Sequence, residues 1–247
     1  MSAPREENSG LVVRGASDLH GFLPTVEPCD VFLLAGDLVP LEIQEDKELS
    51  RQWFSNAFSQ WLEEVPAGEV VAIGGNHDFL LHAVQRRLGS GAHQGLFDAR
   101  WTYLQDAGTT LACGLKVWGT PWSPGTADWA FMGHDHELTE FFDAIPTGLD
   151  VLLTHTPPYG KGDRAPREPN PLAGWLEAHE HIGSTTLQRA IHRAKPRLVV
   201  YGHVHADGGW RLDTPDTRYA NVSVLDENYY LVRPPSERLL PEPSSPP

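Results

Sequence analysis

Short apolar runs recur along the chain, and most of them are bounded by glycine, proline or other turn residues. They alternate with segments in which apolar residues recur with a helical period. This alternation is typical of an α/β protein. The runs that predict strands are residues 11–16, 31–35, 69–73, 110–113, 115–119, 151–154, 198–201, 218–224 and 229–232.

The clearest predicted helix covers residues 46–64. Its apolar residues recur every four positions, at Leu49, Trp53, Ala57, Trp61 and Val65, so one face of the helix is apolar. Shorter helices are predicted over residues 79–88, 137–143 and 184–194. The last of these ends before a proline, which disfavours helical backbone in the preceding residue.

The second half of the chain has consecutive strands with short connections, and hairpins are predicted near Gly114 and near residues 226–228. We therefore expect mixed sheets. Residues 156–183 contain five prolines and no sustained period, which is typical of either a functional lid or a disordered segment. Residues 234–247 contain six prolines and are predicted to form an unpacked tail after a single domain over residues 1–233.

The charge of the chain narrows the classes of partner. Its 247 residues include 19 lysines and arginines against 33 aspartates and glutamates, which gives a formal charge of -14. This deficit argues against long nucleic acid or an anionic membrane surface as a partner. Only two cysteines are present, and no apolar stretch approaches the roughly 18 residues of a membrane helix. These features predict a soluble cytoplasmic protein.

Residue types that bind metal ions stand immediately after five of the apolar runs. They are Asp18-Leu19-His20, Gly36-Asp37, Gly74-Gly75-Asn76-His77-Asp78, His155 and Gly202-His203-Val204-His205. In α/β sheets ligands bind at the carboxyl ends of strands, so five strand ends can direct these side chains to one place. Two further pairs of histidines with the same spacing, His134/His136 and His179/His181, do not follow a strand and a glycine, and we interpret them as solvated residues.

The residue types indicate the chemistry. Asp18 and His20 are two positions apart, as are His203 and His205, so in extended backbone each pair projects to one face. Carboxylate, imidazole and amide ligands without thiolate suit divalent Mn, Fe, Zn or Ni. The seven candidate ligands are Asp18, His20, Asp37, Asn76, His155, His203 and His205. They are too many for one tetrahedral ion, whereas two divalent metal ions that share a bridging carboxylate would use them all.

The order D-x-H, G-D, G-N-H-D, H, G-H-x-H resembles the calcineurin-like metallophosphoesterase superfamily, and the motifs span residues 18–205. Within it, the segments Tyr103-Leu104-Gln105-Asp106, Trp118-Gly119-Thr120-Pro121-Trp122 and Thr154-His155-Thr156-Pro157-Pro158 look like the small metallophosphoesterase-domain proteins. Those proteins are similar to class III cyclic nucleotide phosphodiesterases. The resemblance implies a four-layer α/β/β/α sandwich of two mixed β-sheets flanked by helices, with a dinuclear metal centre.

The resemblance also implies roles for the ligands. Asp18, His20 and His205 would bind the first ion, Asn76, His155 and His203 the second, and Asp37 would bridge them. His77, from the G-N-H motif, would act as general acid or hydrogen-bond donor at the leaving oxygen while a metal-bridging hydroxide attacks in line. His203 is intact at a position that some relatives have changed to glycine, which favours an active enzyme.

Two positions near His77 are left open by the sequence. Asp37 is followed by Leu38-Val39-Pro40-Leu41-Glu42, so the protein-phosphatase signature G-D-x-x-D-R-G is absent and no carboxylate is evident that would orient His77. Asp78 could support a neighbouring ligand or could cap the helix that starts at residue 79; the two readings are equally compatible with the sequence.

The expected function is hydrolysis of a small phosphodiester, nucleotide-like or cyclic, with manganese as the favoured metal. The alternatives are a phosphomonoesterase or a nuclease on the same fold, and a non-catalytic binding protein that kept the fold. Candidate substrate contacts are Lys161, Arg164, Arg167, Trp122 and Trp129, although each is also compatible with a solvated or core position. We expect a small phosphate-ester partner, no membrane and no long nucleic acid, and the sequence leaves the oligomeric state open.

Overall fold

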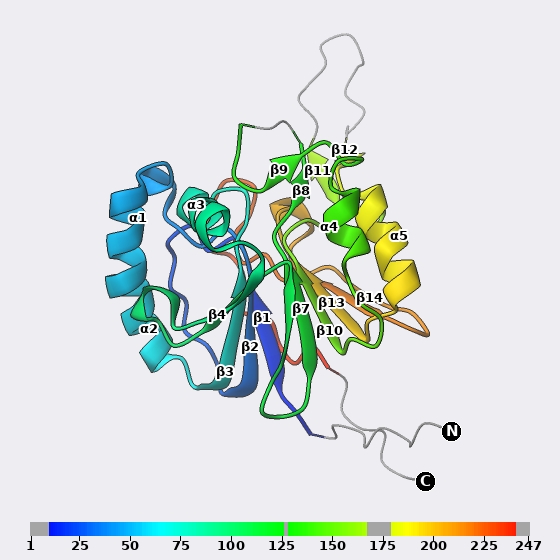
Figure 1. Ribbon diagram of the computed structural model, residues 1–247. Coiled ribbons are helices and arrows are strands. Elements are labelled where there is room, and N and C mark those ends of the chain that lie inside the picture. The colour runs from blue at the N-terminus through cyan, green and yellow to red at the C-terminus, as the bar shows by residue number, and fades with distance from the viewer. Residues whose placement is uncertain (1–9, 126–127, 167–178, 241–247) are drawn as a thin grey trace.

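The computed structural model describes residues 10–125, 128–166 and 179–240, and it has two mixed β-sheets packed between layers of helices (Figure 1). This confirms the predicted α/β/β/α architecture. The first sheet has the order β1-β2-β3-β5-β4. Its strands are β1 (Val13–Ala16), β2 (Cys29–Ala35), β3 (Ala67–Ile73), β5 (Thr102–Gln105) and β4 (Gly91–Gln94). The strands pair in parallel except for β4, which is antiparallel to β5.

The second sheet has the order β14-β15-β13-β10-β7-β6. Its strands are β14 (Arg211–Asp213), β15 (Arg218–Asn221), β13 (Leu198–Tyr201), β10 (Val151–Thr154), β7 (Lys116–Thr120) and β6 (Ala107–Thr110). The four central strands are parallel and both edge strands are antiparallel. Two small sheets lie at one end of the molecule (Figure 1): β8 (Ser123–Pro124) pairs with β9 (Met132–Gly133), and β11 (Arg164–Pro166) pairs with β12 (His179–His181).

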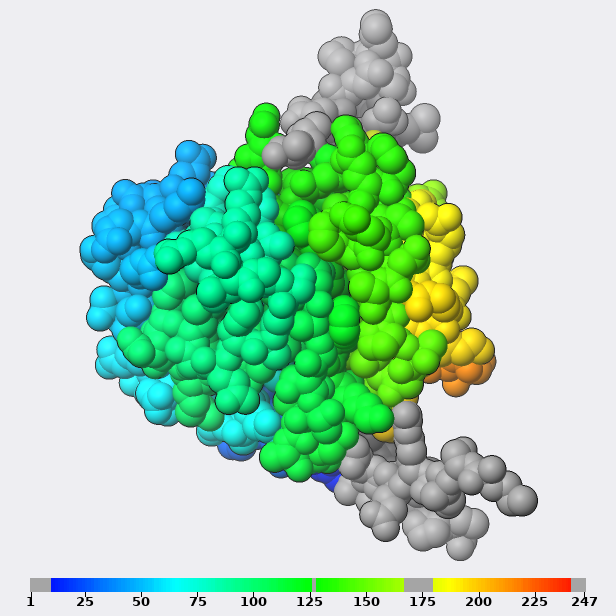
Figure 2. Space-filling model, in the orientation of Figure 1, coloured from blue at the N-terminus to red at the C-terminus, as the bar shows by residue number. Residues whose placement is uncertain are grey.

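The helices cover the two outer faces, and Figure 2 shows α1 and α5 at opposite sides of the molecule. The predicted helix of residues 46–64 is observed as α1 (Lys47–Trp53), a π-helical turn (Phe54–Phe58) and α2 (Ser59–Glu64), with Asp46 as the N-cap. The other helices are α3 (Phe79–Leu88), α4 (Thr139–Asp143) and α5 (Thr185–Ala194), and the 3-10 turns are Leu41–Ile43, Leu96–Asp98 and His205–Asp207. Among the described residues, no helix combines the length and the apolar character needed to cross a bilayer.

The alternation of side chains in the central strands builds the layers. In β2, Val31 and Leu33 point into the core between the sheets, whereas Phe32 and Leu34 point to the outer core that contains the helices. Phe32 meets Trp61 of α2 with ring centroids 6.1 Å apart. In β10, Val151 and Leu153 again belong to the core between the sheets. This period of two fixes which face each strand presents, and therefore how its last residue enters the following loop.

Three predictions about local structure are wrong. The strand expected at 110–113 ends at Thr110, because residues 111–114 form the turn of the β6–β7 hairpin, with Gly114 at φ 86°. Residues 229–232 form no strand; a single bridge joins Leu225 to Leu231. The tail is packed over its described part, since Leu239 is 1% exposed and its N–H donates to the Val13 carbonyl (2.8 Å). Residues 241–247 lie outside the described residues.

Candidate metal centre

The candidate ligands lie on loops that leave β1, β2, β3, β10 and β13, where the sequence placed them. Four of the seven, all non-glycine, have left-handed backbone: φ is 57° at Asp18, 42° at His20, 54° at Asp37 and 67° at His203. Such φ values are uncommon outside glycine, and strained residues of this kind concentrate at functional sites. The chain turns sharply at each of these strand ends, and the turn directs the side chain toward the space between the sheets.

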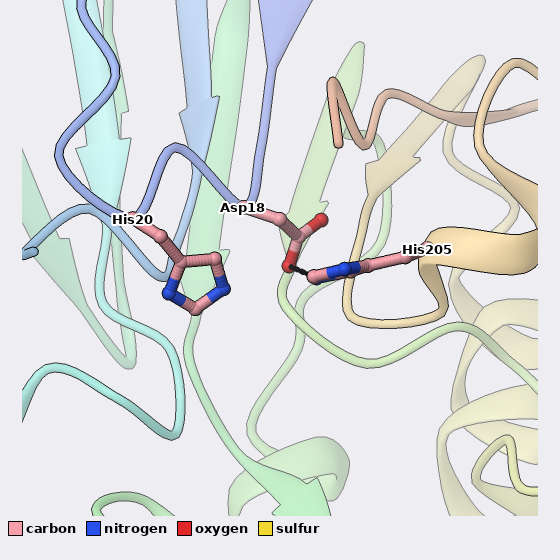
Figure 3. A group of neighbouring side chains, drawn as sticks. All are labelled: Asp18, His20 and His205. Carbon is pink, nitrogen blue, oxygen red and sulfur yellow. Dashed lines mark ion pairs between the residues drawn. The ribbon is translucent and has the colours of Figure 1, made fainter. Parts of the chain in front are cut away.

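Asp18, His20 and His205 form the first group (Figure 3), with ligand atoms that all lie within 4.8 Å of one another. The His205 Nε2 atom lies 3.6 Å from the Asp18 carboxylate. The opposite nitrogen of His205, Nδ1, donates to the carbonyl of Asp226 (3.0 Å), so that Nε2 faces Asp18. This is the orientation of a metal-binding histidine whose second nitrogen is held by a protein oxygen.

Asp37, His155 and His203 form the second group, which also contains Asn76. The Nδ1–H of His155 donates to the Ala35 carbonyl (2.8 Å), which turns Nε2 to the interior. Nε2 then lies 2.9 Å from Asn76 Oδ1 and 3.2 Å from Asp37 Oδ2. With two oxygens around one imidazole nitrogen in a fully buried place, this cluster needs a cation, either a proton or a metal ion.

Asp37 joins the two groups. Its Oδ2 atom lies 3.2 Å from His155 Nε2 and 3.7 Å from His20 Nε2, and these two histidines belong to different groups. Its Oδ1 atom accepts the backbone N–H of His77 (2.8 Å), which fixes the carboxylate. The geometry therefore suits a carboxylate shared between two ions.

The buried histidines supply the test of whether this donor set fits metal ions. Both ring nitrogens of His20 are buried without any hydrogen-bond partner. An unpaired buried polar group is costly, and this cost is relieved if one nitrogen coordinates an ion. Burial lowers the pKa of His20 to about 4, and burial together with the neighbouring His155 lowers the pKa of His203 to about 3. Both are held neutral, as a ligand to a metal must be. The residues thus fit a divalent centre.

The carboxylates are held ionised. Burial opposes the charge on Asp18, but the neighbouring His205 and His155 outweigh it and lower the pKa of Asp18 to about 2. Burial likewise opposes the charge on Asp37, but His155 and His77 hold the pKa of Asp37 well below its ordinary value. For His155, burial lowers the pKa, yet the charge and hydrogen bond of Asp37, together with Asp18 and the Ala35 carbonyl, outweigh burial and raise the pKa to about 9.

Two glycines are required by the close packing of these loops. A Cβ atom at Gly202 would overlap Ser17 and the Asp18 carboxylate, and a Cβ at Gly75 would overlap the Asp37 carboxylate. Any side chain at either position would displace a candidate ligand.

Gln44 orients His77, which answers one question left open by the sequence. It follows the 3-10 turn Leu41–Ile43, and its Oε1 atom accepts the Nδ1–H of His77 (2.5 Å). The His77 Nε2 atom is thereby turned toward the centre, 3.9 Å from Asp37 Oδ2. An amide oxygen thus does the orienting for which the sequence suggested no carboxylate. Gln44 carries no signal in the sequence, because it lies 33 positions away in a polar segment.

Asp78 precedes α3 but makes no side-chain cap. Its carboxylate instead accepts the backbone N–H groups of Gly75 (2.8 Å), Leu38 (3.1 Å) and Val39 (3.1 Å). Burial and the nearby Asp37 raise the pKa of Asp78 to about 7, while these N–H bonds favour the ionised form. The residue ties the loop after β2 to the loop after β3, so of the two readings, support of the neighbouring ligands describes it and the helix cap does not.

One of the candidate substrate contacts lies beside the candidate metal centre, and two others pack against residues elsewhere. Trp129 packs on His77, with ring centroids 4.7 Å apart, and therefore borders the centre. Trp122 is buried and stacks on Phe141 (4.1 Å). Lys161 lies over the Tyr219 ring, and Arg167 lies outside the described residues. His134 and His136 stack on each other away from the candidate metal groups, and His181 pairs with Asp163.

Tyr229 is a site residue that the sequence did not indicate. Its ring lies 5.1 Å from that of His20 and 5.0 Å from that of His205, although the run 229–232 was interpreted as a strand. The left-handed φ of 61° at Tyr229 explains the error, since the chain turns there instead of extending.

Comparison with known proteins places this arrangement in a family. Residues 15–207 match the family model for calcineurin-like phosphoesterase. The chain is 29% identical over 233 residues to the human metallophosphoesterase domain-containing protein 1, covering 87% of this chain and 65% of the human protein. It is 28% identical to the UPF0046 protein T07D4.2 of Caenorhabditis elegans, covering 84% of this chain and 54% of that protein. The chain thus spans less than two thirds of the length of these relatives.

Among solved structures, the phosphopantetheinyl hydrolase of Mycobacterium tuberculosis is similar, with a TM-score of 0.54 at 16% identity over 96% of this chain and 98% of that one. The TT1561 protein of Thermus thermophilus is similar with a TM-score of 0.51 at 14% identity, over 87% of this chain and 91% of that one. These likenesses concern the fold. The family match spans all five ligand motifs, and the chain belongs to the calcineurin-like phosphoesterase family.

Proposed function

We propose that this chain is a dinuclear metal-dependent hydrolase of phosphate esters, and that its substrates are small phosphodiesters. The observation that carries the proposal is the position of Asp37, one carboxylate oxygen of which faces His20 of the first group and His155 of the second. We assign Asp18, His20 and His205 to the first ion, Asn76, His155 and His203 to the second, and Asp37 to both. Manganese is the ion that we propose among Mn, Fe, Zn and Ni, which all suit this donor set.

When bound, the two ions would lower the pKa of water and stabilise negative charge on the phosphoryl oxygens. The protein's own residues would do the rest. Hydrolysis joins the water oxygen to phosphorus, releases a proton of that water to the solvent, breaks the bond from phosphorus to the leaving oxygen, and requires a proton on the leaving oxygen. We assign this proton to His77 in the form that carries a hydrogen on both ring nitrogens, because His77 lines the cleft and its Nδ1–H is bound to Gln44, which leaves the Nε2–H to be donated. After the transfer His77 keeps its Nδ1–H and its bond to Gln44, so the ring stays in place.

The charge of the centre explains how an acidic chain could hold a phosphate. Two divalent ions against Asp18 and Asp37 leave a local positive charge, although the whole chain carries -14. A compact positive site of this kind suits one small phosphate ester. A polymer would need a broad basic surface, which the composition does not supply.

A substrate panel with Mn²⁺-loaded protein tests the proposal, with metal content measured on the same sample. Faster hydrolysis of bis-p-nitrophenyl phosphate and of 2′,3′- or 3′,5′-cyclic nucleotides than of p-nitrophenyl phosphate supports a phosphodiesterase. The reverse order identifies a phosphomonoesterase, and cleavage of oligonucleotides identifies a nuclease. Absence of turnover together with at most one ion per chain identifies a binding protein that kept the fold.

A further inference from the structure

The turn that carries Tyr229 is built by Asp226. The Asp226 side chain accepts the backbone N–H groups of Asn228 and Tyr230, both at 2.9 Å, and its carbonyl accepts the N–H of Tyr229 (3.0 Å). Tyr229 is thereby held at φ 61°, a conformation that is unfavourable for a bulky residue. The same Asp226 carbonyl accepts the Nδ1–H of His205. The position of the Tyr229 ring is therefore coupled directly to a candidate metal ligand.

The ring of Tyr229 lies beside His20 and His205, two of the three residues drawn in Figure 3, and 38% of the residue is exposed. It lines a cleft of about 230 Å³ that opens onto the candidate metal centre. The Tyr229 ring therefore has one side packed on two histidines while the rest is accessible to a molecule in the cleft.

The wall of this cleft on the side of β11 is apolar. It includes Ala165 and Pro166 of β11 and Ile182, which follows β12. The described lining residues are Asp37, Asn76, His77, Ala165, Pro166, Ile182, His203, Val204, His205, Ala206, Glu227 and Tyr229. None of these described residues is a lysine or an arginine, and Glu227 adds a negative charge. In this described part of the cleft, a flat uncharged group would find an aromatic ring and an apolar wall.

We propose that the Tyr229 ring contacts the organic group of the phosphate ester and makes the cleft favour esters in which that group is flat and uncharged. This inference rests on the proposed phosphodiesterase function and adds to it a residue that selects the substrate.

Two diesters with the same leaving group test the role of Tyr229. Phenyl p-nitrophenyl phosphate and methyl p-nitrophenyl phosphate both release p-nitrophenolate and differ only in the group that stays on phosphorus. We expect kcat/KM of the Mn²⁺-loaded protein to favour the phenyl ester by about tenfold, as stacking on an aromatic side chain provides. Tyr229→Ala should remove this preference, mainly through KM, while Tyr229→Phe keeps it. Tyr230→Ala is the matched control, because Tyr230 is 68% exposed and does not line the cleft.

An unchanged ratio of the two esters in Tyr229→Ala overturns the inference and leaves the proposed hydrolase intact. Absence of turnover in the unmodified protein overturns the proposed function instead. In that case, calorimetric titration of the Mn²⁺-loaded protein with phenyl phosphate and methyl phosphate still tests whether the Tyr229 ring contacts the organic group. Tighter binding of phenyl phosphate that is lost in Tyr229→Ala supports the contact, and equal affinities exclude it.

Discussion

The loops that follow the first sheet carry both carboxylates among the seven candidate ligands, whereas the loops that follow the second sheet carry three histidines. Asp18, His20 and Asp37 leave β1 and β2 with positive φ, and the loops after β2 and β3 are tied together by Asp78. The loops after β10 and β15 lead instead to the apolar wall and to Tyr229.

We call the first sheet with the loops that follow its strands the first half of the molecule, and the second sheet with its loops the second half. The difference between them assigns each half its own tasks in the proposed centre. In the proposed centre, the first sheet carries the two carboxylates that would attract the ions, together with His77 as the proposed proton donor. The second sheet would complete the coordination with three histidines and would border the substrate. Variants at the candidate ligands of the first half should therefore affect rate and metal content together, whereas a variant that disturbs only His77 should affect the rate alone. Variants in the second half should affect one ion, substrate preference or local stability.

The largest effect is expected from Asp37→Ala in the first half. Because Asp37 faces residues of both groups, we expect loss of both ions and a fall in turnover of at least about a thousandfold. Metal analysis and hydrolysis at saturating Mn²⁺ measure the two effects. Asp143→Ala, on the exposed end of α4, is the control. Near-normal turnover of Asp37→Ala would refute the shared carboxylate.

His203→Ala tests the second half. The pKa of His203 is lowered by burial and His155, so the ring is neutral and can be replaced without leaving a buried charge. We expect metal content to fall from two ions to one and turnover to fall by about a hundredfold, with the fold intact. The exposed His192→Ala provides the comparison on the same half. Loss of both ions in His203→Ala would show that the halves are not separable.

Gln44→Ala probes the proton-donating part of the first half without touching a candidate ligand. We expect unchanged metal content and a loss of about tenfold to a hundredfold in kcat, confined to esters with poor leaving groups. Gln44→Glu, which keeps an acceptor for the His77 Nδ1–H, should recover most of the rate. Gln52→Ala, on an exposed turn of α1, is the control. An equal loss for p-nitrophenolate and alkoxide leaving groups would show that Gln44 acts in another way.

Most of the candidate ligands in the first half could be predicted from the sequence, because each is marked by a pattern of a few consecutive residues. A run such as residues 31–35 ends at Gly36-Asp37, and a strand followed by a glycine and a carboxylate needs no knowledge of the rest of the fold. The argument from the two-residue spacing of His203 and His205 assumed extended backbone and is wrong: His203 has a φ of 67°, His205 begins a 3-10 turn, and the two side chains belong to different groups. The edge strand β4 was missed because Gly91–Gln94 has no apolar alternation, and only its pairing with β5 makes it a strand.

The residues that were missed are those whose role depends on a turn. Gln44 reaches His77 because the 3-10 turn before it reverses the chain, and Tyr229 reaches His20 because Asp226 stabilises a left-handed backbone. Neither turn leaves a periodic pattern. The C-terminal segment was predicted to be unpacked because of its prolines, so the burial of Leu239 and Leu240 was missed. These two leucines pack against the core between the sheets.

The smallest effect is expected from Asp135→Ala, which concerns the support of the second half. The Asp135 carboxylate accepts hydrogen bonds from Ser184 (2.6 Å) and from the hydroxyl groups of Thr185 and Thr186 (2.5 Å and 2.7 Å), at the start of α5. Burial opposes its ionisation, but these bonds outweigh burial and lower the pKa of Asp135. We expect the variant to lose about 1 kcal/mol in the free energy of unfolding at neutral pH and to keep its activity.

The lowered pKa of Asp135 determines in which direction its stabilising effect changes with pH. The folded state binds the Asp135 proton less tightly than the unfolded state does. The contribution of Asp135 to the free energy of unfolding is therefore fully present above its ordinary pKa of 3.8, and it is lost as the pH falls through the pKa of Asp135 in the folded protein. Urea unfolding of the protein and of Asp135→Ala should therefore give a constant difference near neutral pH that shrinks on acidification below 3.8, with Glu140→Ala as the control. A difference that does not change with pH would mean that Asp135 stabilises α5 by packing alone. Loss of activity would mean that the outer layer of the second half reaches the metal centre, which would remove the division between the halves.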